Sequence, residues 1–159
     1  MTDKSDSTPG SDAPSSDWQT LNAAHAQFEA ELFKLNKATL FDALVSTGVT
    51  QIVVTFDGYG DSGQIEGVEV KDGDKDIDMP GIMIEFAEAI WGVPEPRRSS
   101  VNIATAIESL AYDVLGMTHN GWADGDGAYG SVIFNVAEGL IRLDYDERYI
   151  ATENYVHIF

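Results

Sequence analysis

The sequence predicts an α+β protein in which an antiparallel sheet of about five to six strands has helices packed on one face. Three observations predict this class. Apolar residues recur every three or four positions over residues 17–48 and again over residues 99–116. Short β-branched stretches separated by turn residues follow each helical region. The helices do not alternate singly with the strands, which favours an antiparallel sheet over a parallel doubly wound one.

The first helix is expected over residues 17–35. Asp17 is suited to cap the free N–H groups of its first turn. The apolar stripe of this helix is Trp18, Leu21, His25, Phe28, Leu32 and Leu35. A second helix is expected over residues 37–48, where Gly48 is a natural stop.

Two strands are expected next, at 50–56 (TQIVVTF) and 64–70 (QIEGVEV). The turn-rich segment between them predicts an antiparallel hairpin with a longer loop. In the second strand, a period of two puts Ile65 and Val68 on different faces unless Gly67 marks a bulge. Residues 71–81 are expected to form an acidic loop. Residues 82–92 fit either a strand with one buried face or a short helix, and the strand is favoured.

The second half is expected to begin with a connector, PEPRRSS, because its prolines interrupt regular structure. The helix over residues 99–116 is expected to start at a serine cap and to end at Gly116. Three strand candidates follow it, and they are YGSVIFNV, LIRLDYD and NYVHIF. The short AEG link between the first two predicts an antiparallel hairpin.

Composition divides the chain into a tail and one domain. Residues 1–16 contain no Leu, Ile, Val, Phe, Tyr or Trp, so this segment is expected to be disordered, and residues 17–159 to form a single domain. The chain has 27 Asp and Glu against 9 Lys and Arg, a net charge of -18. This charge disfavours direct binding to nucleic acid and to anionic membranes, and it suits solubility, cations and basic partners.

Cysteine is absent, which excludes disulfides and thiolate metal sites. No signal-peptide core and no run of about 18 apolar residues is found, so a cytoplasmic location is expected. Nucleophile-elbow, zincin and phosphate-loop motifs are missing, so no cofactor is predicted.

Four acidic segments attract interest as sites: 57–66, 72–78, 124–126 and 144–148. The two middle segments resemble calcium loops in their alternating acids but fail the EF-hand spacing, so no metal site is predicted. A solvated turn explains the same residues. The candidate binding residues are Asp57, Asp61, Glu66, His119, Trp122, Asp124, Asp126, Tyr129, Asp144, Glu147 and Arg148.

Residues 38–159 resemble a bacterial family of unknown function that is found in proteobacterial chromosomes and mobile elements. The resemblance rests on the helix AIESLAYDVL, on THNGWADGDGAYG and LDYDERY, and on the ending His157-Ile158-Phe159. VTFDGYGDSGQIE is similar to the family's first hairpin. Family members often carry Glu and Asn at the positions of Ala123 and Gly125. The resemblance implies a shared fold and no activity.

The function expected from these features is that of a small, acidic, non-enzymatic binding or regulatory protein. Its Asp- and Gly-rich loops would meet a basic protein partner, and one version of this hypothesis is mimicry of DNA by rows of carboxylates. The alternative is a metal-dependent hydrolase in which clustered aspartates bind the metal and His119 transfers protons. The two hypotheses differ in geometry, because the second needs loops 57–63 and 121–130 to converge within metal-ligand reach.

Overall fold

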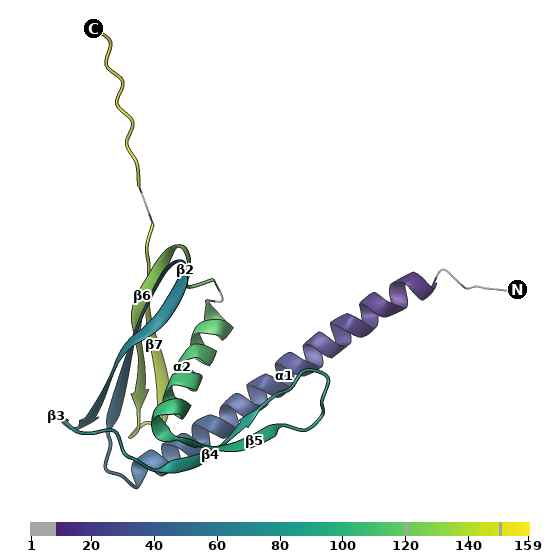
Figure 1. The fold of residues 1–159 in the computed structure, drawn as a ribbon, viewed down its shortest axis with the longest axis vertical. Coiled ribbons are helices and arrows are strands. Elements are labelled where there is room, and N and C mark those ends of the chain that lie inside the picture. The colour runs from purple at the N-terminus through teal and green to yellow at the C-terminus, as the bar shows by residue number, and fades with distance from the viewer. Residues whose placement is uncertain (1–8, 120, 150) are drawn as a thin grey trace, which may run out of the picture.

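A computed structural model of the chain describes residues 9–119, 121–149 and 151–159, and the side chains of 9–16 and 59–62 lie outside this description. The elements in order are α1 (Pro9–Val45), β2 (Gln51–Asp72), β3 (Lys75–Asp76), β4 (Met83–Glu88), β5 (Arg97–Asn102), α2 (Ile103–Thr118), β6 (Asp124–Asn135) and β7 (Leu140–Glu147). The larger sheet is antiparallel with the order β3-β2-β6-β7, and β4 and β5 form a separate antiparallel pair. Figure 1 shows both helices on one side of the larger sheet. The predicted α+β class is confirmed.

Strand β2 is a continuous run of extended residues that doubles back on itself. The backbone N–H of Thr50 donates to the carbonyl of Lys71 at 2.8 Å, although a straight strand would separate these residues by about 70 Å. Gly58 and Gly63 both lie against the ring of Trp122. The predicted hairpin is therefore present as two arms of β2.

The bulge that the sequence allowed within the second arm agrees with the packing. Ile65 and Val68 are both partly buried against the hydrophobic core. Residues three positions apart in a regular strand point to opposite faces, so one extra residue between them brings both onto the core face. Gly67, which is exposed, lies between them and is suited to that irregularity.

Helix α1 replaces the two helices that the sequence predicted, and the expected break between them is wrong. Asn36 is 3% exposed, and its side-chain Nδ2 donates to the Ala87 carbonyl at 2.9 Å while its Oδ1 accepts from the Ala87 N–H at 2.9 Å. This amide pairs with the edge of β4, so the helix continues through a polar residue. The backbone of residues 9–16 belongs to α1, and the prediction for residues 1–8 lies outside the described residues.

Three further predictions about element boundaries are wrong. The second half of the predicted connector 94–100 and the first residues of the helix predicted from residue 99 form β5 (Arg97–Asn102), whose Arg97 and Arg98 pair with carboxylates of β4. Helix α2 starts at Ile103 after an Asn102 cap, in place of a serine, and continues past Gly116 to Thr118. The segment 154–159, predicted as a strand, has no regular structure.

The core lies between the larger sheet and the two helices. The apolar stripe of α2 meets the inner face of β2 and β6, and the C-terminal half of α1 covers the remaining side. The largest fully buried side chains are Phe56, Phe134, Leu40, Leu44, Ile52, Ile103, Ile107, Leu110, Leu115, Val54 and Val132. No helix in the described ranges is long and apolar enough to span a membrane. The N-terminal half of α1 projects beyond this core (Figure 1).

Candidate functional site

Two Asp- and Gly-rich loops meet at one end of the larger sheet. The first arm of β2 pairs with β6 in antiparallel register, and this pairing continues to Gly60 opposite Gly125 and Asp61 opposite Asp124. The register shifts between Gly58 and Gly60. Loops 57–63 and 121–130 are therefore joined through their backbones, as the sequence hypothesis required.

Trp122 fixes this end of the sheet to the core. Its ring meets Phe56 edge-on, with 5.5 Å between ring centroids, and lies 6.4 Å from the ring of Tyr112. A Cβ atom built on Gly58 would come within 2.8 Å of the Trp122 ring, and one built on Gly63 within 2.5 Å. The glycines of the first loop therefore make room for the aromatic residue of the second, because any side chain would displace the ring.

Arg148 connects three segments at the same end. Its backbone N–H donates to the Gly127 carbonyl at 2.9 Å, and its Nη1 donates to the Gly58 carbonyl at 3.1 Å. Its Nη2 lies 2.7 Å from Oδ1 of Asp57, and its guanidinium lies over the Tyr129 ring at 4.7 Å from the centroid.

The Arg148–Asp57 contact is an ion pair and not a well-aligned hydrogen bond. Oδ1 of Asp57 is buried and has no hydrogen-bond partner of normal geometry among the described residues. The negative charge of Asp57 is therefore balanced by the Arg148 guanidinium, whose Nη2 lies 2.7 Å from this oxygen. A carboxylate oxygen in this environment depends on its one cationic neighbour, which makes Arg148 a structural residue of the site.

A polar pocket of about 340 Å³ opens between the loops, the end of α2 and the end of β7. Part of its wall is aromatic. There the imidazole of His119 stacks on the Tyr145 ring, with 3.7 Å between centroids and 8° between planes. Burial, and secondly the charge of Glu147, raise the pKa of the Tyr145 hydroxyl. Among the described residues, the acids that line the pocket are Asp124, Asp126 and Glu147, and Arg148 is the one Lys or Arg that lines it.

The other predicted site residues lie outside this pocket. Tyr129 is opposite Asp57 and beneath Arg148 on the outer face of the sheet, and it is 45% exposed. Asp144 is exposed and pairs with Arg142 at 3.1 Å, one position before Tyr145 and so on the other face of β7.

Glu66 and Asp61 are the remaining predicted site residues. Glu66 is exposed on the second arm of β2 and does not line the pocket. The backbone of Asp61 joins the pairing with β6, but its side chain lies outside the described residues.

The described members of the metal-ligand set of the hydrolase alternative are not brought together, and the side chain of Asp61 lies outside the described residues. Among the described side chains, no group of three or more His, Cys, Asp or Glu residues is placed to hold a metal ion. Asp57 is engaged by Arg148, and Asp144 lies on the face opposite the pocket. His119 stacks on Tyr145. The convergence of the loops thus produces an acidic surface in place of the proposed ligand cluster.

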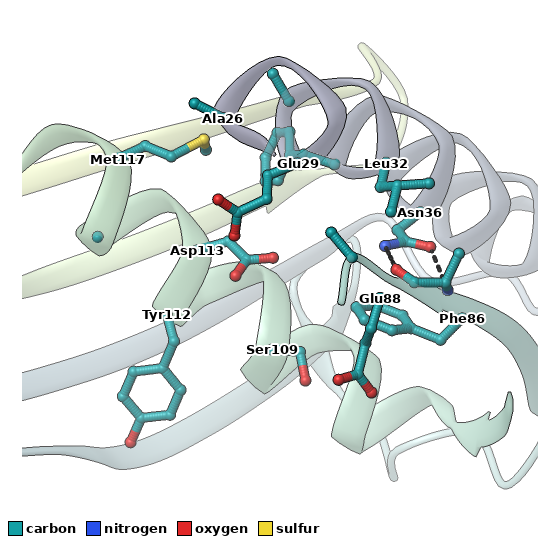
Figure 2. Close-up of a pocket in the computed structure, with 15 residues that line it drawn as sticks. Ala26, Glu29, Leu32, Asn36, Phe86, Glu88, Ser109, Tyr112, Asp113 and Met117 are labelled. Atoms are coloured by element: carbon teal, nitrogen blue, oxygen red, sulfur yellow. Dashed lines mark hydrogen bonds between the residues drawn. The ribbon is translucent and has the colours of Figure 1, made fainter. Parts of the chain in front are cut away.

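Sequence reasoning missed a second concavity, a groove of about 650 Å³ between α1, α2 and β4. Figure 2 shows carboxylates from all three elements around it, namely Glu29, Glu88 and Asp113. Its floor is apolar and includes Leu32 and Phe86. In the local sequence, only the position of Asp113 beside the apolar stripe of α2 could have indicated this groove. Glu29 and Glu88 come from distant parts of the chain.

Asp113 is the most perturbed group of this groove. Desolvation is the main cause that raises its pKa to about 6, and the negative charges of Glu29 and Glu88 add to the shift. The folded protein therefore favours the protonated form of this carboxyl at a pH where an exposed aspartate is ionised.

Fold and site together define a small acidic α+β protein with a carboxylate-lined pocket at one end of its sheet. The model of a family of unknown function, DUF6878, matches residues 32–159, and the chain belongs to this family. The resemblance noted from the sequence over residues 38–159 lies within that match. No curated protein and no solved structure matched the chain.

Proposed function

We propose that this protein is a small, non-catalytic binding or regulatory protein that holds a basic protein partner at the end of its sheet. The observation that carries the proposal is the charge balance of the pocket. Asp124 and Glu147 line it beside Asp126, and among the described lining residues the charge of the one Lys or Arg, Arg148, is already balanced by Asp57 at 2.7 Å. The carboxylates of Asp124 and Glu147 would attract a Lys or Arg side chain of a partner.

The pocket also presents the chemical groups that an arginine side chain contacts. Guanidinium groups stack on aromatic faces and pair with carboxylates at the same time. Arg148 demonstrates this mode within the chain itself, since it lies over Tyr129 and pairs with Asp57. In the pocket, Tyr145 and His119 supply aromatic surface next to the carboxylate of Glu147.

A sharper form of the proposal concerns the partner's own ligand. With a net charge of -18, the chain is suited to occupy a surface of the partner that otherwise binds nucleic acid phosphates. Under this form the protein acts in the bacterial cytoplasm on a regulatory or defence protein, in a mobile-element setting. A partner recovered from the native host would then be displaced from the protein by duplex DNA, and simultaneous binding of DNA would refute this form alone.

The basic-partner proposal is tested with two variants of equal charge. The site variant carries Asp124→Asn, Asp126→Asn and Glu147→Gln. The distal control carries Asp72→Asn, Asp74→Asn and Asp78→Asn, which are exposed acids around β3 at the other end of the sheet. Each variant removes three negative charges, so long-range attraction falls equally in both.

Binding is measured by the fluorescence anisotropy of a labelled arginine-rich peptide at physiological salt. The site variant is expected to bind about 10-fold more weakly than the native chain, and the distal control within about 2-fold of it. Equal weakening in both variants would show that the peptide responds to net charge, and it would refute a defined site.

A further inference from the structure

Among the described residues, the segment 151–159 holds the most exposed apolar side chains. Tyr155 is 73% exposed, Val156 75%, Ile158 92%, and Phe159 fully. Isolated apolar residues on a surface need no explanation, but a contiguous run of this kind marks an interaction site. Figure 1 shows the segment leaving the end of the sheet and running away from the body.

The segment has the form of a strand without a neighbour. The rings of His157 and Phe159 contact each other, with centroids 6.4 Å apart, which places alternate residues on one side of an extended chain. Its backbone N–H and C=O groups take part in no hydrogen bond within the described residues. An extended apolar chain of this kind becomes stable when it is added to the edge of a sheet.

Strand β7 supplies a matching edge. It is the last strand of the larger sheet, so one side of its backbone is unpaired among the described residues. Its core-facing residues Ile141, Leu143 and Tyr145 pack against the core but stay only half-buried. Their period of two matches that of Val156 and Ile158, so a strand added beside β7 would cover this row.

The segment is not suited to fold back onto β7 of its own chain. The connection Arg-Tyr-Ile-Ala-Thr, residues 148–152, contains no Gly, Pro, Asn or Asp. Tight reversals favour these residues, and the two hairpin turns next to β3 and β7 use Gly73 and Gly139 at positive φ values of 63° and 67°. The chain is thus built to continue outward to another molecule.

We propose that residues 153–159 form a β-strand beside β7 of a second copy of this chain, and that two copies exchange these segments reciprocally. A second copy carries the same open edge and the same segment, so one two-fold exchange covers both edges and closes the assembly.

The proposal is tested first by mass. Light scattering and sedimentation of the full chain are expected to give twice the 17.3 kDa chain mass at micromolar concentration. The double variant Val156→Asp, Ile158→Asp is expected to be monomeric, with the native circular dichroism spectrum because both side chains are exposed. The control Leu21→Asp, Met117→Asp changes two other exposed apolar residues and keeps the dimer.

Crosslinking then locates the contact, and the absence of native cysteine makes it clean. Chains carrying only His157→Cys are mixed with chains carrying only Arg142→Cys, because these two side chains would lie on the same outer face of the joined strands, and the mixture is treated with a short bis-maleimide. A product of double mass is expected from the mixture.

Salt dependence gives a separate test. Salt screens the repulsion between two acidic chains, so the dimer is expected to tighten between about 0.05 M and 0.5 M NaCl.

Three results would overturn the exchange. These are a monomeric native chain at every concentration tested, a dimer that survives the Val156 and Ile158 substitutions, and a mixture without the double-mass product. A single chain with both cysteines that crosslinks only within itself would show folding back in place of exchange.

Discussion

Arg148 is the residue whose removal should most clearly separate the two loops. Arg148→Met removes the ion pair with Asp57, the hydrogen bond to Gly58 and the contact with Tyr129, and keeps the aliphatic bulk. It also leaves a buried carboxylate oxygen without its cation. We therefore expect a loss of unfolding free energy together with a disordering of the loops.

The size of the loss follows from burial. Removing one partner of a fully buried pair costs about 3–5 kcal/mol, and a fully exposed pair contributes about 0–1 kcal/mol. The side chains of Arg148 and Asp57 are 36% and 31% exposed, between these limits. We expect about 2 kcal/mol, which for a domain of this size lowers Tm by about 4–8 °C.

Urea denaturation followed by tryptophan fluorescence measures this loss, and Trp122 reports on the site itself. The matched control is Arg142→Met, which removes the exposed pair with Asp144 and should cost less than about 0.5 kcal/mol. A double-mutant cycle with Asp57→Asn is expected to give a coupling of about 1–2 kcal/mol between Arg148 and Asp57. Equal effects of the two arginine variants, or a coupling below about 0.3 kcal/mol, would refute the structural role of Arg148.

Three further perturbations test the packing around the sheet and the groove. Gly130→Ala places a Cβ 2.0 Å from the Asp144 carbonyl oxygen at a φ of 151°, so thermal denaturation should show a loss above about 2 kcal/mol, and a neutral result would contradict the β6–β7 register. Asn36→Ala leaves the buried N–H and carbonyl of Ala87 unpaired and should cost about 2–4 kcal/mol in urea denaturation, whereas a cost below about 0.5 kcal/mol would mean that α1 does not pair with β4. Because the pKa of Asp113 is raised to about 6, the unfolded chain loses this proton first, and the group lowers stability progressively as pH rises from about 4 to 6. Asp113→Asn should therefore stabilise the protein by about 1 kcal/mol at pH 7.5, after allowance for its solvent exposure, and by almost nothing at pH 4, and denaturation at both values checks the difference.

The fold could be predicted from the sequence where apolar periodicity is local. The stripe of α2 and the alternation in β6 and β7 led to elements that the structure contains. The break at Asn36 was wrong because its amide is satisfied by Ala87, 51 positions away in the chain, which no local pattern reveals. Strand β5 was missed because its exposed arginines are explained only by their carboxylate partners on β4.

The candidate site was predictable only where its sequence signals are local. Turn chemistry marked both Asp- and Gly-rich loops, and antiparallel pairing of the strands they join brought them together. The role of Gly58 and Gly63 beneath Trp122, and the pairing of Asp57 with Arg148, depend on contacts between distant segments. The groove lined by Glu29, Glu88 and Asp113 comes from three elements and left almost no sequence signal.

Mapping a bound peptide onto the backbone tests the central claim most directly. An arginine-rich peptide is titrated into ¹⁵N-labelled protein, and amide chemical shifts are followed by NMR. We expect the largest changes to fall together on loops 57–63 and 121–130 and on the end of β7 around Arg148. Changes of equal size on the acidic residues 72–78, or changes confined to one of the two loops, would contradict a single acidic surface at the end of the sheet.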